Sequence, residues 1–204
     1  PTTPEMRPPT QTESTPQIHP NAGRTDGVGS LCVQGLFEAQ AARAPDATAL
    51  VLPVGGRWTY AELRKRAHAI ASLLEARGVG PDIAVGICLE RSAEMVAGVL
   101  GVLKAGGAYV PLDPVYPRDR LAYMLDNSQA PILITQKRLV PSLPACKAKI
   151  ICLDDLSTEY GVRSATAQPV PRTQYPVPST PYQKVGPENL AYVIYTSGST
   201  GTPK

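Results

Sequence analysis

Long apolar runs are missing from this sequence. No stretch approaches the roughly twenty consecutive apolar residues that a membrane-spanning helix needs, and the first residues show no signal-peptide pattern. An excess of charge of one sign is missing as well, because the net charge is only +3. Such a small charge does not favour nucleic acid or an acidic membrane surface as a partner. We therefore expect neither a membrane nor nucleic acid among the partners.

The sequence also lacks clusters of residues that are typical of a metal site or of a catalytic triad. It has four cysteines and two histidines, with no CxxC spacing, no metal-ligand cluster and no Ser-His-Asp set, so no metal site is predicted. Cys88 and Cys152 lie inside apolar runs, which predicts buried thiols in a reducing cytoplasm. His68 is expected at or near the surface of a helix. The basic cluster Arg64–Arg66 is interpreted as a solvated helix face.

Proline, in contrast, is abundant and unevenly placed. Six of the 22 prolines fall in the first twenty residues, which contain almost nothing apolar. Residues 1–29 are therefore predicted to be a disordered linker, since they cannot bury enough surface to offset their ordering entropy. Six more prolines lie between residues 168 and 187, which predicts an extended surface loop at about 157–187. Residues 30–204 form the predicted domain. The first residue is not Met, and both ends are expected to be internal to a longer polypeptide.

Between the proline-rich segments, helix and strand signals alternate. Thr59 and Glu62 have the spacing of a capping box, and Ser92 can cap the next helix. Gly98 and Gly101 inside that second helix predict a close approach to neighbouring backbone. Strands are expected at 47–52, 83–89, 108–112, 131–135, 149–153 and 191–195, of which 83–89 and 191–195 are expected to be buried, with a further helix near 119–127. Strands separated by helices predict an α/β fold with a largely parallel sheet that is covered on both faces.

The last nine residues, 196–204, read TSGSTGTPK. Two glycines allow backbone N–H groups to point into one concavity, hydroxyls add donors, and a lysine adds positive charge, which together suit a polyphosphate. The spacing is neither that of a Walker A loop nor G-x-G-x-x-G. Taken alone, such a stretch is also typical of a flexible tail. The candidate phosphate-binding residues are Thr196, Ser197, Gly198, Ser199, Thr200, Gly201 and Lys204.

Four stretches together resemble one enzyme family, the AMP-forming adenylating enzymes. Residues 195–204, YTSGSTGTPK, are similar to the phosphate-binding signature of that superfamily. Residues 103–121, LKAGGAYVPLDPVYPRDRL, resemble the second core motif of nonribosomal peptide synthetase adenylation domains. Residues 58–63, WTYAEL, resemble their first core motif, with Trp58 where Leu is usual, and residues 36–50 resemble the opening of such a domain. The resemblance covers residues 30–204 and implies the N-terminal portion of the large subdomain, ending after the phosphate-binding loop.

The resemblance implies that an amino acid is activated with ATP and Mg²⁺ to an aminoacyl-adenylate and pyrophosphate. The aminoacyl group would then pass to the phosphopantetheine thiol of a carrier domain, in the synthesis of a secondary metabolite. Neighbouring condensation and carrier domains of the same polypeptide are the implied partners. The resemblance assigns the substrate-selecting residues and the late catalytic lysine to positions beyond 204, so residues 1–204 alone are expected to be inactive.

No catalytic residue is identified within the covered part. Tyr60, Lys104, Tyr109 and Asp113 are interpreted as structural, with Lys104 as a helix-end lysine placed favourably by the helix dipole. Two alternatives stay open. The chain could belong to a stand-alone acyl- or aryl-CoA ligase, or to a non-catalytic, truncated module.

Overall fold

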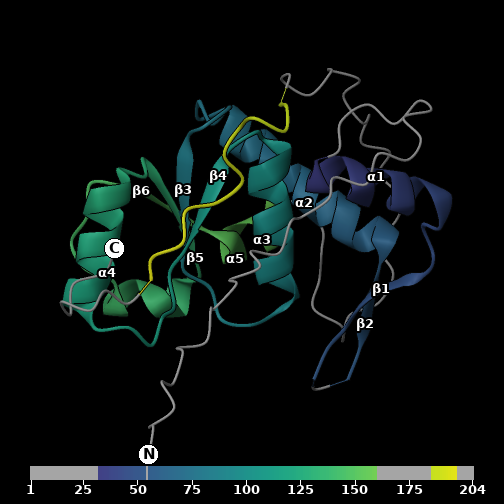
Figure 1. The fold of residues 1–204 in the computed structure, drawn as a ribbon. Helices are drawn as coiled ribbons and strands as arrows, with labels where there is room; N and C mark the ends of the chain where they lie inside the picture. The colour runs from purple at the N-terminus through teal and green to yellow at the C-terminus, as the bar shows by residue number, and fades with distance from the viewer. Residues whose placement is uncertain (1–31, 54, 160–184, 197–204) are drawn as a thin grey trace, which may run out of the picture.

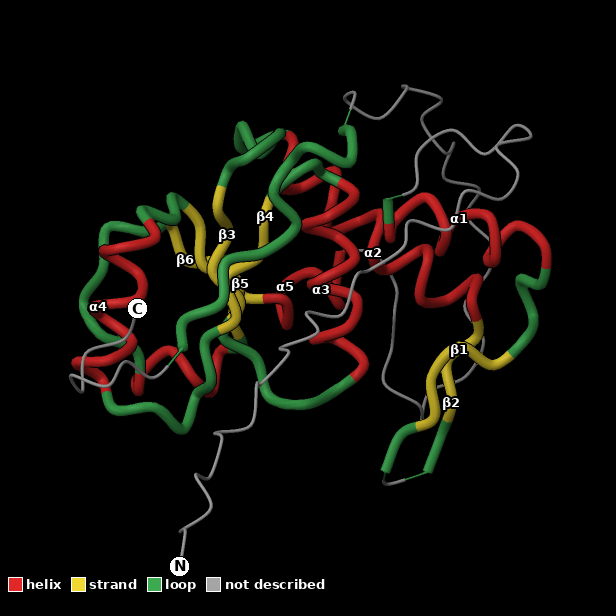
Figure 2. The backbone as a smooth tube through the Cα atoms, in the orientation of Figure 1, coloured by secondary structure: helices red, strands yellow, loops and turns green. Residues whose placement is uncertain are grey.

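A computed structural model describes residues 32–53, 55–159 and 185–196. Nearly all of the predicted linker at 1–29 and of the predicted loop at 157–187 lies outside these residues, so both remain predictions. The elements of the main body (Figures 1 and 2) follow in chain order. They are α1 (Val33–Arg43), β1 (Thr48–Val51), β2 (Arg57–Thr59), α2 (Tyr60–Glu75), β3 (Ala84–Ile87), α3 (Ala93–Lys104), β4 (Ala108–Pro111), α4 (Arg118–Ser128), β5 (Ile132–Thr135), the 3₁₀ helix η1 (Lys137–Ser142), β6 (Lys149–Cys152) and α5 (Leu153–Glu159).

The predicted α/β architecture is confirmed. Four strands form a parallel sheet in the order β4-β3-β5-β6, in which Val85 of β3 aligns with Tyr109 of β4 and with Ile132 of β5. The hydrophobic cores show that α2, α3 and α5 pack on one face of the sheet and α4 on the other. The connection after β3 therefore crosses one face through α3, and the connection after β4 crosses the other face through α4 (Figure 1). β1 and β2 form a separate antiparallel pair.

Both predicted helix caps are confirmed. The Thr59 hydroxyl accepts a hydrogen bond from the backbone N–H of Glu62 at 3.2 Å, and the Glu62 carboxylate accepts one from the backbone N–H of Thr59 at 2.8 Å. This reciprocal pair is a complete capping box at the start of α2. At the start of α3, the Ser92 hydroxyl accepts from the backbone N–H of Met95 at 3.3 Å. Both caps satisfy N–H groups that the helix itself leaves without an acceptor.

α2 and α3 pack closely, and the expected close approach is found at Gly101. A Cβ atom at this position would lie 2.6 Å from Cγ2 of Ile70 and 3.2 Å from the backbone oxygen of Ala67. Ile70 is completely buried, so its side chain has no free space to move into. Gly98 differs, because a Cβ there would make an ordinary contact of 3.4 Å with a terminal carbon of Leu89.

Replacing Gly101 by Ala is expected to destabilise the fold by about 1–3 kcal/mol, the usual cost of overpacking a core. The matched control is Gly98→Ala, in the same helix, where ordinary contact and better helix propensity predict no loss. Urea unfolding followed by the fluorescence of the single tryptophan, Trp58, which packs against this core, would measure both variants. Equal stability of the two variants would contradict the close approach at Gly101.

The prediction of a solvated basic face at Arg64–Arg66 is wrong for Arg66. This side chain is completely buried, with Nε 2.8 Å from Oε2 of Glu94 on α3 and Nη2 donating to the backbone oxygen of Leu153 at 2.9 Å. The reason is helical spacing, because Arg66 lies on the inner side of α2 with Leu63 and Ile70. Arg66 therefore joins α2, α3 and the start of α5.

Lys104 is the last residue of α3, as expected for a helix-end lysine, and it is almost completely buried. Its ammonium group pairs with the carboxylate of Glu38 on α1. The same carboxylate binds Arg64, with 2.7 Å between Nε of Arg64 and Oε2 of Glu38. Glu38 thus ties α1 to α2 and α3. Within the described residues, no helix is long and apolar enough to cross a membrane.

Two short helical elements were not predicted. η1 follows β5, and α5 begins directly after β6, so that the expected strand 149–153 ends at Cys152. α5 extends to Glu159, past residue 157, where the proline-rich surface loop was expected to begin. Leu153 and Leu156 of α5 are buried against α2 and α3, and this tertiary packing explains the helix better than any local sequence pattern.

Candidate functional site

Of the candidate phosphate-binding residues, the structure describes Thr196, which is exposed. Ser197, Gly198, Ser199, Thr200, Gly201 and Lys204 lie outside the described residues, and their arrangement as a phosphate-binding loop remains a prediction. The structure does describe the segment that leads into them, residues 185–196, and this segment determines where the candidate loop starts.

Residues 190–196 run beside β4 but do not form the buried strand that was expected at 191–195. The backbone N–H of Tyr109 donates to the oxygen of Ala191, and that of Val193 donates to the oxygen of Tyr109, both at 3.0 Å. These two bonds make a single parallel bridge between Tyr109 and Tyr192. The outer row of side chains is exposed, since Tyr192 is 53% exposed and Ile194 is 55% exposed. One bridge on one side is too little for a strand, and the contact of the Tyr192 ring with the Tyr109 ring, at 5.7 Å between centroids, leaves the outer row largely exposed.

Residues 190–196 begin at a polar junction, a set of hydrogen bonds between residues 186–190 and the loop before β3. Asp82 accepts hydrogen bonds from the backbone N–H of Leu190 at 2.8 Å and from the side-chain amide of Asn189 at 3.1 Å. The Asn189 amide oxygen in turn accepts from the backbone N–H of Gly186 at 3.0 Å. Asp82 has a left-handed backbone, with φ of 62°, which Asp tolerates better than most residues. The junction fixes the point at which residues 190–196 start along β4.

The segment ends at a contact with α4. The Tyr195 hydroxyl donates to the side-chain oxygen of Asn127 at 2.7 Å, and its ring meets the Tyr123 ring edge to face at 6.3 Å between centroids. Val193 and Tyr195 also pack against the core beneath α4. Burial raises the pKa of Tyr195, and Tyr123 adds to this, so the hydroxyl keeps its proton at neutral pH. Sequence reasoning missed this contact, because nothing local links 127 to 195.

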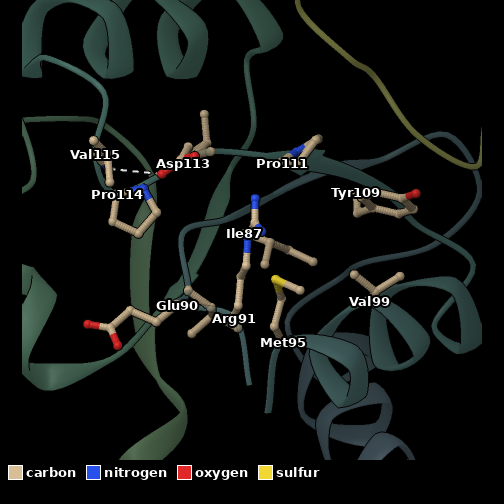
Figure 3. Close-up of a pocket in the computed structure, with 12 residues that line it drawn as sticks. Ile87, Glu90, Arg91, Met95, Val99, Tyr109, Pro111, Asp113, Pro114 and Val115 are labelled. Atoms are coloured by element: carbon tan, nitrogen blue, oxygen red, sulfur yellow. Dashed lines mark hydrogen bonds between the residues drawn. The ribbon is translucent and has the colours of Figure 1, made fainter. Parts of the chain in front are cut away.

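A cavity of about 610 Å³ lies at the carboxyl ends of β3 and β4 (Figure 3). Its floor is apolar, and Glu90, Arg91 and Asp113 supply polar groups. The other lining residues are Ile87, Leu89, Met95, Val99, Tyr109, Pro111, Leu112, Pro114 and Val115. The Asp113 carboxylate accepts a hydrogen bond from the backbone N–H of Val115 at 3.0 Å, which shapes the rim.

The position of this cavity is typical of ligand sites in α/β proteins. Ligands of open parallel sheets bind outside the carboxyl ends of strands, where neighbouring connections leave over opposite faces. β3 and β4 meet this condition through α3 and α4. Because residues 190–196 run parallel to β4, Thr196 lies toward the same edge of the sheet. The candidate phosphate-binding loop therefore begins at the edge where the cavity opens. Sequence reasoning missed the cavity because its lining residues form no single motif.

Other titratable groups show no catalytic arrangement. All four cysteines are free thiols, and burial raises the pKa of Cys88 to about 11, with a smaller contribution from Asp113. The expected burial is confirmed for Cys88, while Cys152 is half-buried. His68 is half-buried, as expected for a helix surface, and burial followed by Lys104 lowers its pKa. The described part of the chain contains no group of His, Cys, Asp or Glu side chains that could hold a metal ion.

Comparison with known proteins identifies relatives over most of the chain. A component of the linear gramicidin synthase of Brevibacillus parabrevis is 50% identical over 175 residues, which are 86% of this chain and 3% of that protein. Among solved structures, the nonribosomal peptide synthetase FmoA3 in its AMPPNP-bound form is 39% identical with a TM-score of 0.66, over 83% of this chain and 17% of that one. The N-terminal subdomain of Klebsiella oxytoca NpsA, in complex with 3-hydroxybenzoyl-AMSN, is 26% identical with a TM-score of 0.70, over 89% of this chain and 42% of that one.

This chain therefore spans only a small part of the gramicidin synthase component and less than half of each of the two solved structures. The family model described as AMP-binding enzyme matches residues 37–204, which include all four stretches of the sequence resemblance except Leu36. These matches confirm the resemblance to nonribosomal peptide synthetase adenylation domains. The chain belongs to the family of AMP-binding enzymes.

Proposed function

We propose that this chain supplies the phosphate-binding part of an adenylation domain in a nonribosomal peptide synthetase. The observation that carries the proposal is the path of residues 190–196, which lie beside β4 and end with Thr196, the first residue of the candidate loop, toward the sheet edge that holds the 610 Å³ cavity. Membership of the AMP-binding family and the similarity to an AMPPNP-bound synthetase support ATP as the ligand.

The proposed reaction joins an amino acid to AMP. A carboxylate oxygen of the amino acid attacks the α-phosphorus of ATP, the bond from that phosphorus to the bridging oxygen breaks, and pyrophosphate leaves. This chemistry depends on positioning and on neutralising phosphate charge, for which the backbone N–H groups, hydroxyls and Lys204 of the candidate loop are suited. The loop is rich in donors, which suit an anion. Mg²⁺ would therefore enter with the ATP phosphates, since Mg²⁺ is commonly held through substrate phosphates.

The aminoacyl group would then pass to the phosphopantetheine thiol of a neighbouring carrier domain, with a condensation domain as the second neighbour. The four free thiols fit the reducing cytoplasm, where ATP is available, and we propose that the reaction takes place there.

Amino-acid-dependent exchange of pyrophosphate into ATP tests this proposal, using the protein that carries this sequence at its full natural length. We expect one or a few amino acids to stimulate exchange well above a reaction without amino acid. A second assay incubates the protein with ATP, coenzyme A and fatty or aromatic acids and detects acyl-CoA as a product. It tests for a stand-alone CoA ligase. Acyl-CoA formation would favour that alternative, and absence of exchange with every acid would favour a non-catalytic module.

A further inference from the structure

The structure describes an unassigned contact directly next to the candidate phosphate-binding loop. Tyr195 precedes Thr196, and its hydroxyl donates to Asn127 in the last turn of α4 at 2.7 Å. Tyr123 lies one turn earlier on the same helix and meets the same ring edge to face. α4 thus presents three side chains, those of Tyr123, Asn127 and Ser128, to one residue of the segment, and the residue they hold is the last one before the candidate loop.

This contact is the last one that the described residues make before the candidate loop. The backbone bonds to Tyr109 end at Val193, and Asp82 holds the segment only at its start, at Asn189 and Leu190. Between Val193 and the candidate loop, the hydrogen bonds that join the segment to the rest of the described chain are those of the Tyr195 hydroxyl, with Asn127 and with Ser128. The position of Thr196, the first residue of the candidate loop, therefore depends on this side chain.

The contact of Tyr195 with α4 also determines which way the neighbouring side chains of the segment point. Side chains alternate between the two sides of an extended segment, so Tyr195 points toward α4 while Ile194 and Thr196 are exposed on the other side. A slip by one residue would exchange the two sides and turn the first hydroxyl of the loop away. The Tyr195–Asn127 bond opposes such a slip because it requires one particular residue.

We infer that Tyr195 and Asn127 are a positioning pair that orients the candidate loop toward the phosphates of a nucleoside triphosphate. The inference rests on the proposed function for the identity of the ligand. The pair acts through the loop and does not touch the ligand. Misplacing groups that hold a reacting phosphate costs rate and affinity steeply, so a modest hydrogen bond at the base of the loop has a measurable effect.

The test is a double-mutant cycle in the full-length protein with Tyr195→Phe, Asn127→Ala and both together. Loss of one hydrogen bond is worth about 0.5–1.5 kcal/mol, so each single variant is expected to weaken Mg-ATP binding roughly two- to tenfold. The double variant is expected to be no weaker than Tyr195→Phe alone, because that change already removes the bond to Asn127 together with the bond to Ser128. Binding of adenosine, which has no phosphate, is expected to stay unchanged in all three.

Tyr192→Phe is the matched control. Tyr192 lies on the same segment, is 53% exposed, and its hydroxyl makes no hydrogen bond with the described residues. We expect this variant to bind Mg-ATP like the wild type. Additive losses in the cycle, or equal losses for ATP and adenosine, would show a purely structural role and overturn the inference.

Direct measurement of Mg-ATP binding distinguishes a failure of this inference from a failure of the proposed function. Wild-type protein that binds Mg-ATP but shows no exchange with any acid would refute the proposed reaction, and the cycle would still decide on the pair. Wild-type protein that binds no Mg-ATP would overturn both. Unchanged Mg-ATP affinity in Tyr195→Phe would overturn the positioning pair alone.

Discussion

Replacing Lys204 by Ala in the full-length protein is expected to lower amino-acid-dependent ATP–pyrophosphate exchange by about 10²–10³-fold. Removing one donor that acts on developing charge in a transition state typically has an effect of this size. Lys204 is the one cation of the candidate loop at 196–204, and compact ammonium groups are common phosphate ligands. Thr200→Ala, which removes a hydroxyl donor from the same loop, is expected to lower exchange as well.

Lys147→Ala is the matched control for this result. Lys147 is exposed in the described part of the chain and lies between η1 and β6, outside the candidate site. Its removal changes the net charge as Lys204→Ala does, but we expect the exchange rate to stay within a factor of two of wild type. If Lys204→Ala and Thr200→Ala both exchanged at the wild-type rate, the assignment of residues 196–204 to the ATP phosphates would be wrong.

Arg66→Met is expected to produce the largest loss of stability, about 3 kcal/mol. Removing one partner of a buried ion pair is strongly destabilising, because the other charge stays behind without compensation. The Glu94 side chain is 25% exposed, so water offsets part of the loss and places it at the lower end of the usual range. The hydrogen bond to the Leu153 oxygen is lost as well, which weakens the attachment of α5. Met keeps most of the side-chain length and so limits the cavity that forms.

Arg64→Met offers a close comparison, since it makes the same change two residues earlier on the same helix. The Arg64 side chain is 41% exposed, and its pair with Glu38 lies near the surface. Such pairs contribute less than about 1 kcal/mol. Urea unfolding of both variants, followed by Trp58 fluorescence, would show whether Arg66 is the outlier. A loss below 1 kcal/mol for Arg66→Met would mean that the buried pair barely stabilises the fold.

Local signals in the sequence predicted local structure well. The caps at Thr59 and Ser92 were correct because the bonds that form them join residues three positions apart. The parallel sheet followed from the alternation of helices and strands. Arg66 was misassigned because its charge was given more weight than the helical spacing that places it with Leu63 and Ile70. Its partner, Glu94, is 28 residues away and gives no local signal.

The candidate site was predictable only in part, for a similar reason. The residue types and spacing at 196–204 indicate phosphate chemistry, but the surroundings of the loop depend on contacts over long separations. Asp82 holds Leu190 across 108 positions, and Asn127 meets Tyr195 across 68. Burial of residues 191–195 was overestimated. An apolar, β-branched sequence indicates that a segment is suited to burial, but the segments that pack against it determine whether it is buried.

The strand order also bears on how the chain can fold while it is being synthesised. β3 is the first strand of the parallel sheet to leave the ribosome, and it is an interior strand of the order β4-β3-β5-β6. β4 then joins one side of it and β5 the other, β6 adds to β5, and residues 190–196 reach the outer side of β4 last. Every later strand adds to an open edge, and none must be inserted between two strands already paired. Because the sheet grows outward from β3, each later strand can pair as soon as it leaves the ribosome.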